Sequence, residues 1–298
     1  MDTARGAAPT YSSSAVRPGP IGLVREAVGE LRSRRQLVRY LVQADLKKKG
    51  ADSLLGNLWW VLDPLLQMLV YVILVTVIFQ RQQEAYPLFI FAAILPWKWF
   101  TSSIGDAITS VSSQDRLIKQ IHFPKLVLPT TALASGIANF AFGLIPLLTL
   151  MVIFYPHKLS LTLLYMPLIA IVQLVFTAAL GFVLSAVNVF YRDVGNLSRH
   201  VLRLWFYLSP GLYGAATMAG LADKHPQLYS LMQLNPFFIL FGAYRQVIYG
   251  TETPGGGSLP PAAPDWASLS VLLVVSLVLL FAATIFFKRI EPTFAKVL

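Results

Sequence analysis

The residues that could carry out chemistry are few and lie far apart in the sequence. The four histidines have no ligand partner three or four positions away, so their spacing predicts no metal site. No G-x-x-x-x-G-K-[ST] segment is present to hold nucleotide phosphates. Neither a G-x-S-x-G segment nor a pair of acids spaced as general acid and base occurs. We therefore expect no catalytic residue, no metal and no cofactor in this chain.

Aromatic residues offer a different chemistry, because flat rings pack against the C–H faces of sugar rings and leave the hydroxyl groups wet. They gather near the ends of the first two apolar stretches and beside Ser209-Pro210-Gly211. An aromatic belt at the membrane surface is the alternative, and for any single tryptophan it is the better explanation. The residues that we expect to line a channel are Trp59, Tyr71, Trp97, Tyr207 and Tyr213.

The composition places these residues in a membrane. Of the 298 residues 56% are hydrophobic and only 13% are charged, too apolar a balance for a soluble domain. Six stretches are long enough to span, since about 20 residues cross the hydrocarbon layer. The first begins either at Leu58 or, with Asp63 as a cap, at Pro64. We expect an all-α polytopic protein with spans at residues 58–79, 87–108, 127–154, 161–190, 201–218 and 269–287.

The basic residues set the orientation of these spans. With the amino terminus inside, 19 of the 24 Lys and Arg residues fall in cytoplasmic segments and four fall outside. Both termini should therefore be cytoplasmic, in a multi-pass protein of the bacterial inner membrane. The net charge of +10 then follows from topology, and it gives no reason to expect nucleic acid as a partner.

The segment before the spans divides into two parts. Residues 1–20 are rich in Ala, Ser, Pro and Gly and are expected to be disordered. Residues 21–57 hold a basic amphipathic helix, from Ile21 to about Val42, that we place on the cytoplasmic membrane surface. A solvated helix docked on a soluble partner is the alternative. Residues 58–298 form the six-helix membrane domain.

Two connections between spans are distinctive. The cytoplasmic segment after the second span begins with serines suited to capping and predicts a short helix that ends before Pro124. The external segment of residues 219–268 contains a piece too short to span and too apolar for water, which predicts a re-entrant hairpin. Residues 251–264 are expected to form a flexible connector.

Several short motifs occur in a particular order around these spans. Over residues 21–298 the sequence resembles the ABC-2 family of transporter permeases, specifically the exporters of O-antigen, teichoic acid and galactan. The motifs that carry the resemblance are Asp45-Leu46-Lys47, Ser53-Leu54-Leu55-Gly56-Asn57-Leu58-Trp59, Asp63-Pro64-Leu65-Leu66, the segment from Leu117 to Pro124, Tyr191-Arg192-Asp193-Val194, Leu208-Ser209-Pro210 and Leu234-Asn235-Pro236-Phe237.

The resemblance implies an assembly and a cargo. Two copies of this chain would join two nucleotide-binding subunits, which hold ATP and Mg and hydrolyse the ATP. The cargo would be a polysaccharide linked to polyprenyl diphosphate. An ABC-2 exporter of a small lipid or drug is an alternative cargo class. A polytopic glycosyl- or phosphotransferase is the alternative of another class, but it would need acidic or metal-binding loop clusters that the sequence lacks.

The resemblance also implies roles for individual residues. The short cytoplasmic helix would be the coupling helix that docks on the ATPase, although a turn on the membrane surface is the alternative. Arg192 and Asp193 would form an ion pair that fixes the end of the fourth span. Lys47, Lys48 and Lys49 are candidate contacts for the diphosphate, and Arg192 and Arg199 are further cations near the inner leaflet, although topology explains all of them without a substrate. The coupling residues are Ser112, Ser113, Gln114, Asp115, Arg116, Leu117, Ile118, Lys119 and Ile121; the external gate is Asn235, Pro236, Phe237, Phe238, Tyr244 and Arg245; Tyr191, Arg192 and Asp193 end the fourth span.

Overall fold

The fold is a bundle of long apolar helices. The structure, a computed structural model, describes residues 18–50, 55–78, 80, 83–120, 123–253 and 257–297. Within these residues the chain is helical apart from turns, loops and one isolated β-bridge, so the expected all-α class is confirmed. The expected disordered tail lies outside the described residues as far as residue 17, and a helix already begins at Pro20.

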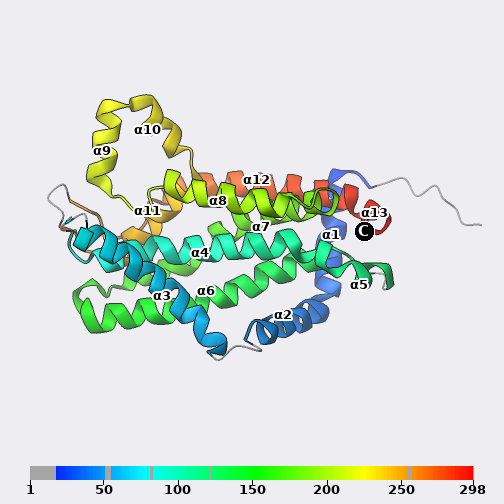
Figure 1. The fold of residues 1–298 in the computed structure, drawn as a ribbon. Helices are drawn as coiled ribbons and strands as arrows, with labels where there is room; N and C mark the ends of the chain where they lie inside the picture. Colours follow the sequence, from blue (N-terminus) through cyan, green and yellow to red (C-terminus); the bar gives the residue numbers. More distant parts are fainter. Residues whose placement is uncertain are drawn as a thin grey trace, which may run out of the picture.

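Five helical segments are long and apolar enough to cross a membrane. Four of them run lengthwise through the molecule and α3 lies obliquely across them (Figure 1). The bounds of these helices agree with five of the six expected stretches to within a few residues. They are α3 (Trp59–Val72), which continues as a π-helical segment (Ile73–Ile78), α4 (Tyr86–Ser110), α6 (Val127–Phe154), α7 (Met166–Phe190, preceded by a 3₁₀ segment at Leu161–Tyr165) and α12 (Trp266–Ile290).

The central helix of the bundle is α4, which packs against α3, α6, α7 and α8. In its apolar 18-residue window 78% of the residues are buried, against 11% in α3. Pro96 lies inside α4, and its carbonyl accepts a hydrogen bond of 2.8 Å from the buried Gln173 side chain of α7. This bond gives a buried amide a partner. The open face of α3 is left to contact lipid or another chain.

The expected fifth span is not a single helix. Helix α8 (Val194–Leu208) ends where Pro210 forces the preceding Ser209 into an extended conformation, with ψ at 149°. Its 15 residues reach only about 22 Å, less than the hydrocarbon thickness of about 30 Å. The apolar sequence continues past this break and so concealed it. The chain then forms α9 (Ala215–Lys224), α10 (Pro226–Gln233) and α11 (Pro236–Ile248).

The expected amino-terminal helix is in fact two helices, α1 (Pro20–Ser33) and α2 (Arg35–Gly50), which meet at Arg34. Helix α1 buries Leu23 and Ala27 and packs against α12, whereas α2 packs against α6. Each helix thus covers a different part of the bundle. Helices α1, α5 (Asp115–Gln120) and α13 (Phe294–Val297) lie at one end of the bundle, here called the α5 end, and α9 and α10 lie at the other, the α11 end (Figure 1).

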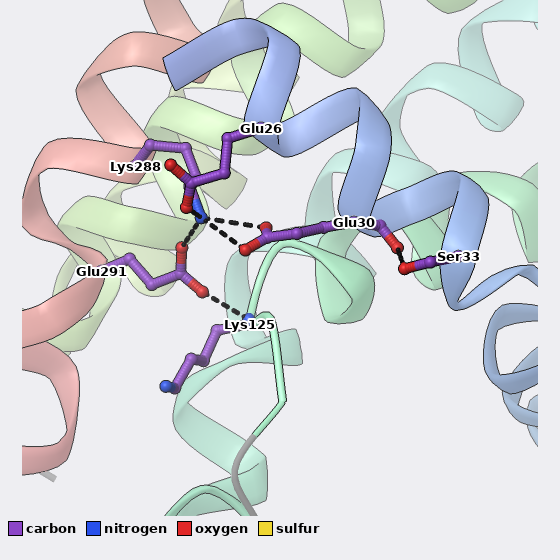
Figure 2. A network of polar contacts seen from close by, with 6 residues as sticks. All are labelled: Glu26, Glu30, Ser33, Lys125, Lys288 and Glu291. Atoms are coloured by element: carbon purple, nitrogen blue, oxygen red, sulfur yellow. Dashed lines mark hydrogen bonds and ion pairs between the residues drawn. The ribbon is translucent and has the colours of Figure 1, made fainter. Parts of the chain in front are cut away.

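A network of charges holds α1 on α12. Lys288 has a side chain only 6% exposed, and its Nζ lies 2.9 Å from Glu26 and Glu30 and 3.0 Å from Glu291. The second oxygen of Glu291 accepts a hydrogen bond of 2.6 Å from the Lys125 amide just before α6 (Figure 2). Burial raises the pKa of Glu30, and charged Lys288 opposes that rise. One lysine therefore joins three carboxylates from two distant parts of the chain and offsets part of their negative charge.

Replacement of Lys288 by methionine should release α1 from α12. The change leaves Glu26, Glu30 and Glu291 close together without a cation. The free energy that holds α1 on α12 should fall by about 2 kcal/mol. This value lies between those typical of exposed and of buried ion pairs, because Glu26 and Glu30 are partly exposed. Hydrogen exchange of residues 20–33 in detergent or nanodiscs measures this release. The control, Lys296→Met, removes an exposed cation of α13; equal protection of α1 in both variants would contradict the prediction.

Asp63 does not cap the first span. It lies inside α3 together with Pro64, and its carboxylate pairs with Lys98 of α4. Lys98, which the charge count left within the second span, is thereby matched by an acid. The pair ties α3 to the central helix.

The expected flexible connector is docked wherever it is described. The Thr253 amide donates to Gly257 at 2.9 Å, and the Leu259 amide donates to Thr251 at 2.8 Å. Glu84, just before α4, accepts hydrogen bonds from the backbone and side chain of Ser258. These bonds hold the pKa of Glu84 below its usual value, so the carboxylate stays charged to a lower pH than that of an ordinary glutamate. Residues 254–256 lie outside the described residues.

Candidate transport pathway

A cavity of about 1140 Å³ opens between α3, α4 and α8. Its lining changes along α8 from basic to aromatic. Arginines and amides lie near the start of α8, at the α5 end, and rings lie near its last turn. The arginines and the asparagines of the lining are Asn188, Arg192, Asn196, Arg199 and Arg203; the aromatic residues are Tyr71, Trp97, Phe206 and Tyr207.

Three of the five aromatic residues expected in a channel line this cavity together: Tyr71, Trp97 and Tyr207. The Trp97 ring lies 5.4 Å from that of Phe206, and the Tyr71 ring lies 6.1 Å from it. The other two expected residues lie elsewhere. Trp59 borders a pocket of about 200 Å³ beside Asp63, and Tyr213 borders one of about 340 Å³ at the α11 end.

Helix α11 is part of the core of the bundle. Phe237, in its first turn, is fully buried and its ring lies 4.7 Å from that of Trp97 and 4.6 Å from that of Phe100, beyond the middle of α4. Tyr249, just after the helix, packs 5.3 Å from Phe89 near the start of α4. Tyr244 is also fully buried. Helix α11 therefore lies along the first half of α4, and Pro236 and Phe238 beside Phe237 are only partly exposed.

The side chain of Asn235 joins the start of α11 to the break that ends α8. Its Oδ1 accepts hydrogen bonds from the Phe237 amide at 3.0 Å and from Trp205 Nε1 at 2.9 Å. Its Nδ2 donates to the Ser209 hydroxyl at 2.8 Å, and that hydroxyl donates to the Trp205 carbonyl at 2.7 Å. One asparagine thus caps α11 and gives hydrogen-bond partners to the Ser209 hydroxyl and the Trp205 indole at the break in α8.

Arg245 holds the other side of the same break. Its guanidinium donates to the carbonyl oxygens of Pro210 and Gly211, and to that of Phe89 at 3.4 Å. Its Cζ lies 3.6 Å from the centre of the Phe89 ring, a cation–π contact. The residue is 8% exposed. Arg245 therefore joins α11, the end of α8 and α4 at one buried point.

The expected coupling segment forms a 3₁₀ turn at Ser112–Gln114 followed by α5 at the α5 end (Figure 1). Ile118 is not on its outer surface, because it is 5% exposed and belongs to an apolar cluster that includes Phe287 and Phe294. Ile121 and the side chain of Leu117 lie outside what the structure describes. Asp115 borders the large cavity. The residues on the outer surface are Ser113, Gln114, Arg116 and Lys119.

Asn188, near the end of α7, connects this segment to α8. Its Nδ2 donates to the Ser112 hydroxyl at 3.0 Å, and its Oδ1 accepts from the Gly195 amide at 3.2 Å. Asn188 is 4% exposed, and it borders the large cavity together with Ser112 and Gly195. The expected ion pair between Arg192 and Asp193 is not formed; both residues and Tyr191 are exposed. The buried amide fixes this turn instead.

The comparison with protein families agrees with this architecture. Residues 36–249 match the model of the ABC-2 type transporter family, over a range that runs from α2 to the end of α11. The chain belongs to this family.

Curated relatives of this ABC-2 chain match it over almost their whole length. An O-antigen export system permease protein RfbA of Myxococcus xanthus is 35% identical over 269 residues, covering 90% of this chain and 98% of the relative. A protein of the same name from Klebsiella pneumoniae is 26% identical over 264 residues, covering 88% and 95%. ABC-2 membership together with the apolar helices makes this chain a multi-pass membrane transport protein.

Two of the motifs that suggested the ABC-2 family meet in space. Ser209, of Leu208-Ser209-Pro210, is bonded to Asn235, of Leu234-Asn235-Pro236-Phe237. Sequence reasoning missed Asn188, which has no motif of its own. The available signal was an amide in an otherwise apolar stretch, three residues before Tyr191.

The lysines proposed to contact a diphosphate lie at the end of α2. Lys47 and Lys48 are exposed and do not border the large cavity, and the side chain of Lys49 is not described. Their contact with substrate stays a prediction.

Proposed function

We propose that this chain is the membrane-spanning subunit of an ATP-driven exporter of O-antigen-type polysaccharide, carried on polyprenyl diphosphate. The full-length similarity to O-antigen export permeases supports the cargo. The observation that carries the proposal is the cavity between α3, α4 and α8, because Tyr71, Trp97 and Tyr207 give it the ring faces that sugars pack against. Its polar residues keep the sugar hydroxyls solvated.

In this proposal the chain crosses the bacterial inner membrane six times. Helix α8 with the segment after Ser209 is the fifth span, and α9 to α11 form a re-entrant external gate. The α5 end, which holds both described chain ends, faces the cytoplasm (Figure 1). The burial of α11 beside the middle of α4 supports the gate, because a short apolar helix is tolerated at membrane depth only when protein covers it.

A second copy of the chain would complete the pathway. The exposed apolar residues of α3 and α8, which include Leu66, Val70 and Leu204, adjoin residues that line the cavity. A two-fold homodimer would cover these faces and place two cavities about one axis. Two ABC subunits would hold ATP and Mg and press on the coupling segment, where Arg116 and Lys119 lie on the outer surface.

Depletion of the protein in its native cell tests the proposed cargo. We expect polyprenyl-linked polysaccharide to accumulate on the cytoplasmic side and surface glycan to disappear. Extraction of the lipid-linked glycans followed by sugar analysis measures both and names the polymer. If no such lipid accumulates and the glycan still reaches the surface, the protein exports a smaller lipid or drug instead.

A further inference from the structure

The basic end of the large cavity has its own chemistry, distinct from the aromatic end. Arg199 and Arg203 lie one helical turn apart on α8, and Arg192 lies in the turn that precedes the helix. Phe206 and Tyr207 lie three and four residues beyond Arg203, so the rings begin about 4.5 Å along the helix axis from the last arginine. A molecule that enters from the α5 end meets three guanidinium groups before it meets the rings.

The three arginines carry positive charges that the protein does not neutralise. Among the described residues, no carboxylate lies within ion-pair distance of Arg192, Arg199 or Arg203. The one side-chain bond formed by the three goes from Arg199 to the neutral Asn196. Lys98 and Lys288, in contrast, are each paired with acids. Positive-inside topology explains the number of arginines near the cytoplasm, but it does not explain why these three face one cavity with no described acid paired to any of them.

An anionic ligand would supply the missing charge. The planar guanidinium group binds phosphate oxygens through two parallel hydrogen bonds, and two arginines a turn apart match two neighbouring phosphates. Asn196 and Gly195 border the same end of the cavity. Asp115 is the single carboxylate in the described lining, so the cavity mouth stays strongly positive.

We propose that Arg192, Arg199 and Arg203 form the site that receives the diphosphate of the lipid carrier, with the first sugars held against Tyr71, Trp97 and Tyr207. This inference rests on the proposed function. It moves the diphosphate contact from the lysines at the end of α2 to the mouth of the cavity. The polyprenyl tail would stay in lipid beside the exposed face of α3, where Leu69 and Ile73 are about half exposed.

The test measures binding of undecaprenyl diphosphate to the purified transporter with its ATPase partner, in nanodiscs, by native mass spectrometry. Arg199→Gln/Arg203→Gln should weaken binding about tenfold or more, as expected for the loss of two charge-assisted contacts. Arg199→Lys/Arg203→Lys preserves charge and topology and should weaken binding by less. The matched control, Arg289→Gln/Lys296→Gln, removes two exposed cations at the same end of the bundle and should change binding less than about twofold.

The outcomes separate this site from the proposed function. If wild-type protein binds undecaprenyl diphosphate and the double glutamine variant binds it equally well, the arginine site is wrong and the cargo stands. If phosphatidylglycerol competes as well as undecaprenyl diphosphate does, the arginines bind any anionic lipid and the inference is overturned. If wild-type protein does not bind undecaprenyl diphosphate at all, the proposed carrier is wrong and the inference falls with it. Equal melting temperatures for all variants establish that each is folded.

Discussion

Replacement of Arg245 by methionine is expected to loosen the segment of residues 209–214 and abolish most export. Methionine keeps the length of the side chain but removes every donor, so the carbonyls of Pro210, Gly211 and Phe89 lose their bonds to the guanidinium. An unsatisfied buried carbonyl costs about 1–3 kcal/mol, so the free energy of unfolding should fall by about 4 kcal/mol in total. Hydrogen exchange of residues 209–214 and the melting temperature in nanodiscs measure the effect directly.

Two further variants show whether the guanidinium itself matters. Arg245→Lys retains a charge, but a single ammonium cannot reach all three carbonyls in the planar geometry, so an intermediate loss is expected. Lys296→Met removes an exposed cation from α13, outside the proposed gate, and should leave both exchange and export unchanged. Normal exchange of residues 209–214 in Arg245→Met would show that the break in α8 is held by other contacts, with Asn235 the first to test.

Arg245 also shows where sequence reasoning reaches its limit. The charge count placed it among four external cations, because the segment around it is too short to span. The structure buries it over Phe89, 156 residues away along the chain. Hydropathy identifies a segment that is too apolar for water, but it does not identify which backbone carbonyls will need a donor once Pro210 has broken α8. That need arises only when α4, α8 and α11 come together.

The elements that hydropathy predicted well are those whose burial is decided locally. The expected ranges of α6 and of the α7 segment match the observed bounds, since each is a long apolar run. The error in the fifth span lies at Pro210, which breaks the helix locally, whereas the error in the amino-terminal helix occurs where a polar pair joins distant residues. The break between α1 and α2 allows Glu26 and Glu30 to meet Lys288, more than 250 residues later. No pattern of period 3.6 contains that information.

The prediction of aromatic channel residues was correct only for the residues whose helices enclose the same cavity. Tyr71, Trp97 and Tyr207 come together because α3, α4 and α8 enclose one cavity. Trp59 is excluded because α3 crosses α4 obliquely, so the start of α3 borders a different pocket beside Lys98. Ring type and depth along a span were available from the sequence, but the rotation of each helix was not.

Replacement of Asn188 by leucine should uncouple ATP hydrolysis from export. Asn188 binds Ser112 of the coupling segment and Gly195 of α8, so it is the direct polar link between the proposed ATPase contact and the wall of the cavity. Leucine has nearly the same volume but leaves the Gly195 amide and the Ser112 hydroxyl without this partner, at about 1–3 kcal/mol each. In the complex with the ATPase subunit, we expect ATP hydrolysis to continue while glycan exported per ATP falls by about tenfold or more.

An exposed amide of α2 provides the control for this link. Gln36→Leu makes a similar change of side chain outside the coupling segment and the cavity and leaves both Asn188 bonds intact, so the ratio of export to hydrolysis should stay at the wild-type value. Ser112→Ala removes one of the two Asn188 bonds, and its ratio should fall between those of Gln36→Leu and Asn188→Leu. An equal loss of hydrolysis and export in Asn188→Leu would mean that the residue supports assembly, because a broken mechanical link lowers export alone. A graded fall in the ratio across the three variants would instead show that the motion of the coupling segment reaches α8 through these two hydrogen bonds.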